Sequence, residues 1–167
     1  VKSTLMSGYK SIAIKGTGAE EDARILAGAR LASYRLDKYM TKLTDDQKPS
    51  VETVTLVTSA VEAATKAYGP LEASVQGTEL ARDLVHEPPN VLYPASYADR
   101  IRELEALGVK VTVLGEKEMT ELGMHSLLGV GQGSVRESHM AIMEWNGGGD
   151  EAPVAFVGKG VCFDTGG

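Results

Sequence analysis

The sequence contains a single cysteine, Cys162, among 167 residues. Because a disulfide needs two cysteines, the chain can form no internal disulfide and no zinc site built from several cysteine ligands. A reducing compartment is the simplest interpretation. The sequence also lacks an apolar run near the roughly 20 residues that a membrane-spanning helix requires, and its first residues do not resemble a signal peptide. We therefore expect a cytoplasmic location and no membrane partner.

Basic residues are not in excess, because 17 Lys and Arg stand against 23 Asp and Glu and give a formal net charge of −6. This balance offers no electrostatic reason to expect nucleic acid or an anionic membrane as a partner. A small neutral or cationic substrate fits it better. Aromatic residues are also few, at 5%, while the 43% hydrophobic and 24% charged residues are ordinary values for a folded globular protein.

Hydrophobic periodicity predicts alternating helices and strands along the chain. Amphipathic patterns predict helices over residues 19–34, 61–68, 71–85, 94–107 and 116–122. Alternating or continuous apolar residues predict strands over 51–57, 109–114, 139–145 and 153–158. We place a domain boundary at Pro88 and Pro89, since proline ends the helix before it. The alternation after this boundary indicates an α/β fold.

A glycine cluster from Gly129 to Gly133 raises the question of a phosphate-binding loop, because glycine turns let the backbone approach a phosphate. The third glycine comes one position too early for the dinucleotide-binding pattern. The residues that follow, from Ser134 onward, do not continue as an amphipathic helix. We therefore favour a structural turn, with nucleotide binding as the weakest alternative.

The three histidines and the cysteine are better explained by structural roles. His86 begins a pattern similar to that of zinc peptidases, but Pro88 forbids the helix that the pattern needs. His86 is therefore expected to be a polar residue at a helix end. His125 and His139 have no partners at metal-ligand spacing. Cys162 lies between apolar neighbours, where a buried thiol behaves as a small hydrophobic residue.

The segment around Lys159 offers the most specific candidate chemistry. Lys159 follows the predicted strand 153–158, is flanked by Gly158 and Gly160, and precedes Asp164 by five residues. Spacing alone favours a structural ion pair at a strand turn over a metal site. A lysine in an apolar setting can nevertheless lose its proton, because desolvation disfavours the charged form, and the neutral amine can then bind a metal. A nearby carboxylate can bridge two cations.

Residues 158–167 resemble the metal-binding signature of the leucyl aminopeptidase family, also called the cytosol aminopeptidase family, whose members are two-metal peptidases. Cys162 and Thr165 stand where the family usually has Thr and Ser, and both differences leave the ligands intact. Further segments resemble the family in the family's order: residues 33–39, 81–90 and 122–133. His86 stands where Asn is usual. The resemblance covers most of the chain.

The resemblance implies a two-domain α/β architecture. Residues 1–69 would form the end of a smaller N-terminal α/β domain, 70–87 a connecting helix, and 88–167 the first part of a larger α/β catalytic domain with a mixed central sheet. The chain begins at Val1 rather than Met and stops at Gly167, directly after a strand-like run. We interpret it as an internal fragment of a family member.

The resemblance also implies a metal-dependent aminopeptidase that releases N-terminal amino acids, with a leucine-like preference, from peptide substrates. In the family the lysine matching Lys159 binds one metal, and the aspartate matching Asp164 bridges two. The metals are two Mn²⁺ or Zn²⁺ ions, with Mg²⁺ as a third option, and they activate a water. Family members commonly form hexamers, so we expect a homo-oligomer. The remaining ligands and the catalytic residues are expected beyond residue 167, so this chain alone should be inactive.

An alternative remains open on the sequence. A family member that has lost catalysis could persist as a structural or binding subunit. The two hypotheses differ in whether the complete protein retains the second lysine and the further carboxylates that an active two-metal site needs.

Overall fold

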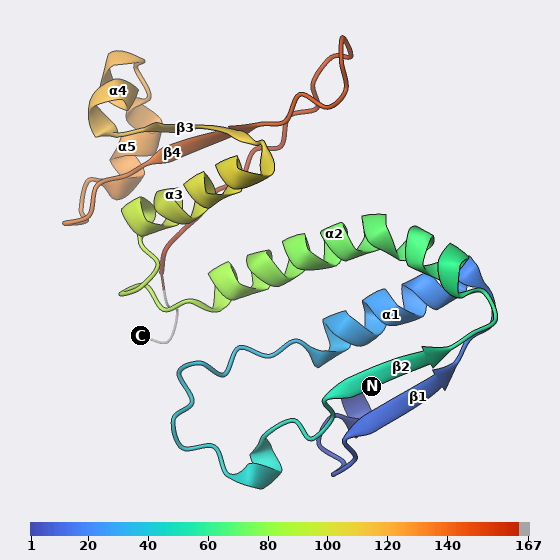
Figure 1. The fold of residues 1–167 in the computed structure, drawn as a ribbon. Helices are drawn as coiled ribbons and strands as arrows, with labels where there is room; N and C mark the ends of the chain where they lie inside the picture. The colour runs from blue at the N-terminus through green and yellow to red at the C-terminus, as the bar shows by residue number, and fades with distance from the viewer. Residues whose placement is uncertain (164–167) are drawn as a thin grey trace. The chain divides into compact units, whose positions relative to one another are not determined.

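The structure of the protein is a computed structural model that describes residues 1–163. It divides into two compact units, Val1–His86 and a second unit that starts at Glu87. Helices and strands alternate in both units (Figure 1), so the predicted α/β class is confirmed. Among the described helices, none is long and apolar enough to cross a membrane.

The first unit is built on two parallel strands, β1 (Ser11–Lys15) and β2 (Thr53–Val57). They pair in register from Ser11↔Thr53 to Lys15↔Val57. Parallel neighbours need a crossover connection, and helix α1 (Ala19–Ser33) with the loop after it supplies this connection. Two short 3₁₀ helices complete the region before β2, η1 (Lys2–Thr4) and η2 (Asp45–Gln47).

Both strands alternate exposed and half-buried residues, as expected for a sheet with one covered face. The half-buried residues are Ile12 and Ile14 in β1 and Val54 and Leu56 in β2. The predicted strand at 51–57 is thus confirmed, whereas β1 was not predicted. The alternation of Ile12 and Ile14 with smaller or polar residues is the signal that could have indicated it.

Helix α2 (Val61–His86) runs without interruption through Pro70. The sequence predicts two helices here, closed and reopened at Gly69 and Pro70, and this prediction is wrong. A proline inside a helix removes one backbone hydrogen bond and crowds the preceding turn. The long packing surface that α2 shares with α1 offsets this local cost. The helix ends at His86, as predicted from the prolines that follow.

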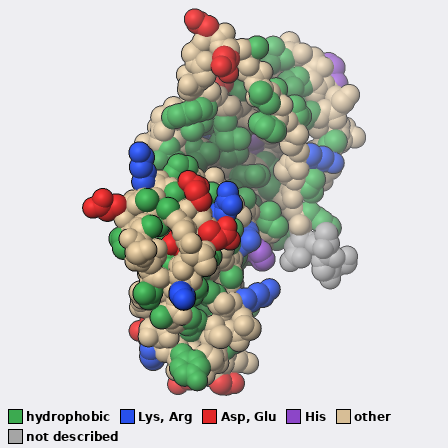
Figure 2. Space-filling view, turned by 90° about the vertical axis from the view of Figure 1, so that its right-hand side faces the viewer, with side chains coloured by type: hydrophobic (Ala, Val, Ile, Leu, Met, Phe, Trp, Pro, Cys, Tyr) green, Lys and Arg blue, Asp and Glu red, His purple; other side chains and the backbone are tan. Residues whose placement is uncertain are grey.

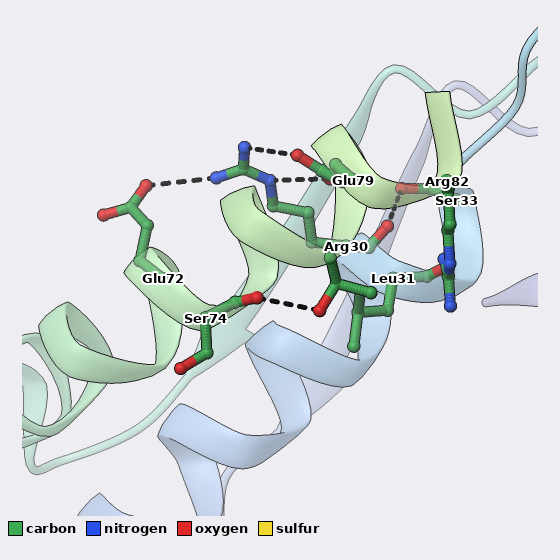
Figure 3. A network of polar contacts seen from close by, with 8 residues as sticks. Arg30, Leu31, Ser33, Glu72, Ser74, Glu79 and Arg82 are labelled. Carbon is green, nitrogen blue, oxygen red and sulfur yellow. Dashed lines mark hydrogen bonds and ion pairs between the residues drawn. The ribbon is translucent and has the colours of Figure 1, made fainter. Parts of the chain in front are cut away.

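A polar network holds α2 against α1 (Figure 3). The Arg30 guanidinium donates to both carboxylate oxygens of Glu79 at 3.0 and 2.8 Å and to Glu72 at 3.2 Å. The hydrogen bond to Glu79 raises the pKa of Arg30. Arg82 donates to the backbone carbonyl of Leu31 at 2.9 Å. These contacts join residues that lie about 40 to 50 positions apart in sequence.

Tyr34, just after α1, adds a further contact to α2. Its hydroxyl donates to Asp83 at 2.7 Å, and its ring lies beneath the Arg82 guanidinium at 5.3 Å. Burial, followed by the hydrogen bond to Asp83, raises the pKa of Tyr34 to about 12. The ring of His86 lies 6.2 Å from that of Tyr34. The C-terminal end of α2 is therefore held to the end of α1 by contacts with the Leu31 carbonyl and the Tyr34 side chain.

The second unit combines short helices with one antiparallel strand pair. Its helices are α3 (Pro94–Arg102), η3 (Glu103–Leu107), α4 (Glu116–Glu121) and α5 (His125–Gly131). Strand β3 (Lys110–Leu114) pairs with β4 (Met140–Glu144) in the register Lys110↔Glu144 to Leu114↔Met140. The predicted helix 94–107 is therefore α-helical at first and 3₁₀ at its end, where Gly108 closes it with a φ of +86°.

Among the described residues of the second unit, few apolar side chains are buried: Leu92, Ala98 and Met119. Met119, on α4, has no exposed surface. Many other hydrophobic side chains, green in Figure 2, lie at the surface. The predicted strand at 153–158 is not formed, because the described chain after β4 is neither strand nor helix. Strands require neighbours, and the described residues provide none for this run.

Candidate metal-binding segment

The candidate metal-binding segment starts at Gly158. It follows β4 and a turn at residues 147–150, where Gly149 has a φ of +62°. It lies against α3 at one position. A Cβ atom on Gly160 would stand 2.9 Å from a ring carbon of Tyr97, closer than side chains normally approach. Glycine at position 160 therefore allows the backbone next to Lys159 to pass directly over this ring.

Lys159 is exposed rather than held at the end of a buried strand, so that part of the prediction is wrong for this chain. Within residues 1–163 its ammonium group forms no hydrogen bond or ion pair. The described residues therefore neither bury this amine nor pair it with a carboxylate. Asp164, the second predicted ligand, lies outside the described residues, and its role stays a prediction.

Cys162 is half-buried, and this burial raises the pKa of its thiol. A raised pKa disfavours the thiolate, which is the nucleophilic form. The side chain therefore fits the predicted role of a small apolar residue better than a catalytic one.

The histidines do not gather into a site. His86 is the last residue of α2, as predicted, and its Nδ1 lies 2.6 Å from the carbonyl of Arg82. His125 is the first residue of α5, and the Nδ1 of His139 lies 3.1 Å from the carbonyl of Glu137. Within the described part of the chain, no three His, Cys, Asp or Glu side chains could together hold a metal ion. Residues 1–163 therefore do not assemble a metal site by themselves.

The glycine cluster at 129–133 is partly helical, since α5 ends at Gly131. A Cβ atom on Gly131 would overlap the hydroxyl of Ser138, so glycine here serves close packing of the returning chain. The structural interpretation is therefore supported, although the residues form a helix end rather than an open turn.

A separate cavity of about 470 Å³ opens at the C-terminal ends of β1 and β2. The cavity is lined by Lys15, Gly16, Thr17, Gly18, Val57, Thr58, Ser59 and Ala60. The buried Asp22 carboxylate lies behind Gly16 and accepts hydrogen bonds from the N–H groups of Thr17 at 2.8 Å and Gly18 at 3.3 Å. The Thr58 hydroxyl and these N–H groups lower the pKa of Asp22.

The carboxylate of Asp22 thus takes the backbone donors that a bound anion would use. Glu20 and Glu21 add further negative charge to the same helical turn. The N-terminus of α1 therefore disfavours a bound anion at this cavity, although Lys15 lines it.

Comparison with known proteins places the chain in a family of peptidases. Residues 79–167 match the family described as "Cytosol aminopeptidase family, catalytic domain". The chain belongs to the cytosol aminopeptidase family, and the resemblance found in the sequence is confirmed. The match begins inside α2 and includes both Lys159 and Asp164.

Curated relatives named "Probable cytosol aminopeptidase" agree with this assignment. The protein of Caulobacter vibrioides is 52% identical over 164 residues, covering 96% of this chain and 33% of its own length. That of Rhizobium etli is 52% identical over 164 residues, covering 94% of this chain and 33% of its own. The chain thus spans about a third of the length of the curated relatives it matches.

Two solved structures of the bottromycin maturation enzyme BotP share the fold. One, in complex with Mn, is 27% identical with a TM-score of 0.65 and covers 84% of this chain and 30% of its own. The other is 29% identical with a TM-score of 0.66 and covers 85% of this chain and 32% of its own.

Proposed function

We propose that the complete protein is a metal-dependent aminopeptidase that releases N-terminal amino acids, with a leucine-like preference, from peptides. The observation that carries this proposal is the match of residues 79–167 to the catalytic domain of the family. This match includes the one stretch of the chain, from Gly158 onward, that resembles a metal-binding signature. Residues 88–167 would then form the first part of that catalytic domain.

In this proposal Lys159 binds one of two divalent metal ions and Asp164 bridges both. A nitrogen and a carboxylate oxygen are donors that Zn²⁺ and Mn²⁺ accept. The Mn in one of the BotP structures makes Mn²⁺ the first metal to test. When bound, two such ions lower the pKa of a water and polarise the peptide carbonyl. The contribution of this chain is to supply two donors at the end of one apolar run.

The chain alone should be inactive. Lys159 is exposed, and no carboxylate cluster surrounds it among residues 1–163. Metal sites that bind tightly need several donors in a fixed geometry, and most of these must come from other parts of the complete protein. A homo-hexameric assembly and the domain limits at residues 69 and 87 belong to the same proposal, because the family resemblance implies them. A cytoplasmic location is proposed with them, on the single cysteine and the lack of a long apolar run in the sequence.

A chimera can test the activity. This chain would replace the aligned third of the Caulobacter vibrioides relative, and hydrolysis of leucine amide would be measured with Mn²⁺ and after chelation. We expect chelator-sensitive hydrolysis by the chimera and none by the 167-residue chain. Lys159→Met and Asp164→Asn should each lower kcat/KM by at least about 100-fold, because each removes a donor. Lys110→Met, which removes an exposed lysine paired with Glu144, is the matched control.

Two outcomes would contradict the proposal. Measurable chelator-sensitive hydrolysis by the isolated chain would show that the donors absent from it are not needed. A folded chimera that is inactive beside an active relative would instead favour the alternative, a family member kept as a structural or binding subunit.

A further inference from the structure

The two glycines that flank Lys159 differ in their surroundings. Neither Gly158 nor Gly160 has a positive φ, so neither is required by the backbone conformation. A Cβ atom on Gly158 would meet nothing within 4 Å. A Cβ atom on Gly160 would stand 2.9 Å from Cε1 and 3.5 Å from Cδ1 of Tyr97. Non-bonded carbon atoms normally stay about 3.5–4.0 Å apart, so close approach to this ring is the structural reason for glycine at position 160.

Tyr97 is a rigid support for this contact. It lies near the start of α3, where its backbone N–H donates to the Tyr93 carbonyl at 2.8 Å. The next residue, Ala98, is buried, and α3 contacts both β3 and β4. The Tyr97 side chain is half-buried and has only two torsions about which it can turn. The ring therefore holds a fixed place in the second unit, and the chain that returns past α3 after β4 passes against it (Figure 1).

The contact is made by the ring of Tyr97 and not by its hydroxyl. The atoms of Tyr97 that lie nearest to the Cβ position of Gly160 are the ring carbons Cε1, Cδ1 and Cζ. Among residues 1–163, the Tyr97 hydroxyl makes no hydrogen bond. Phenylalanine at position 97 would therefore preserve the contact, whereas leucine, which has no atom at the Cε1 position, would not.

We infer that Tyr97 is a positioning residue for Lys159, because its ring fixes the backbone at Gly160 and so the direction in which the lysine side chain leaves the chain. A lysine between two unsupported glycines would lie on very flexible backbone. A metal ligand must be held within about 0.5 Å of its working position, and residues that support ligands commonly change metal affinity about 10- to 100-fold. The inference rests on the proposed function in one respect, that Lys159 is a ligand.

Proton NMR of the 167-residue chain tests the ring contact without any metal. An aromatic ring shifts the resonances of nearby protons, so an α-proton of Gly160 should resonate away from its random-coil position. Tyr97→Phe should retain this shift, and Tyr97→Leu should abolish it. The α-protons of Gly158, whose Cβ position is open, are the internal control and should move far less. A Gly160 resonance that is unchanged in Tyr97→Leu would overturn the inference.

Metal affinity tests the positioning role in the chimera with the Caulobacter vibrioides relative. Tyr97→Leu should raise the Kd for Mn²⁺ by about 10- to 100-fold, and Tyr97→Phe should keep it within about twofold of the unsubstituted chimera. Tyr93→Leu is the matched control, because Tyr93 precedes the same helix but its ring lies under Arg136 at 3.6 Å. Circular dichroism checks that each variant is folded. Equal losses of affinity in Tyr93→Leu and Tyr97→Leu, or no loss in either, would overturn the inference.

A substitution at Gly160 approaches the same contact from the other side. Gly160→Ala adds the methyl group for which Cε1 of Tyr97 leaves no room, so it should weaken Mn²⁺ binding by the chimera. In the Tyr97→Leu background the same substitution should weaken binding much less, because residues in contact have non-additive effects. Additive effects of the two substitutions would refute a direct contact between the two residues.

Failure of the proposed function would be visible separately. Mn²⁺ binding by the chimera that Lys159→Met leaves unchanged would overturn both the proposed ligand and the positioning role of Tyr97. Mn²⁺ binding that Lys159→Met abolishes and Tyr97→Leu leaves intact would overturn the positioning role alone.

Discussion

The small core of the second unit makes it sensitive to a single substitution, Met119→Ala. Met119 lies on α4, the helix that follows β3, and its side chain has no exposed surface. Truncation of a fully buried methionine to alanine costs about 2–3 kcal/mol, toward the low end of the range for such changes because flexible surroundings can partly close the space. A loss of this size lowers the ratio of folded to unfolded protein by roughly 30- to 150-fold.

Urea unfolding followed by the fluorescence of Trp145, the single tryptophan, reports on the second unit, since Trp145 directly follows β4. Met119→Ala should shift the transition to a lower urea concentration or remove it entirely. Met143→Ala is the control, because this methionine is 53% exposed and its truncation should cost less than about 1 kcal/mol. Equal shifts for the two variants would refute the reasoning that Met119 holds this unit together.

Three further predictions concern the first unit. Because the pKa of Asp22 is lowered from 3.8, its contribution to stability is present above pH 3.8 and is lost as the pH falls below it. In acid unfolding curves, Asp22→Asn should therefore reduce the dependence of stability on pH in this range. An unchanged pH dependence would contradict the lowered pKa. Tyr34 should titrate near pH 12 by ultraviolet absorbance, its contribution to stability being lost as the pH rises from 10 to 12, and Asp83→Asn should lower that pKa. Arg30→Met should lower the melting temperature by calorimetry, whereas Arg24→Met, which breaks only an exposed 3.6 Å ion pair, should not.

Local signals in the sequence explain which parts of the fold were predictable. The acidic first turn of α1 and the glycine at position 108 are local signals, and they predict the start of α1 and the end of the helix before Gly108 correctly. The helix break predicted at Pro70 is wrong because the side chains that pack against α2 come from α1, far away in sequence. The strand predicted at 153–158 does not form for a related reason, because a strand is stable only beside partner strands.

The candidate site depended on a different kind of signal. The spacing of Lys159 and Asp164 favoured a structural ion pair, and only the ordered family segments indicated metal ligands. The family match supports the assignment of the chain, but the geometry around Lys159 in this chain neither gathers donors nor buries the amine. A metal site assembled from distant parts of a polypeptide cannot be derived from the spacing of two of its ligands.

Metal content is the most direct test of the central claim that Lys159 and Asp164 are ligands. The chimera with the Caulobacter vibrioides relative would be dialysed against Mn²⁺ and its bound metal measured by mass spectrometry. We predict about two metal ions per chain in the chimera and a clear loss in both Lys159→Met and Asp164→Asn, with Lys110→Met unchanged. The same metal content in all four proteins would contradict the claim.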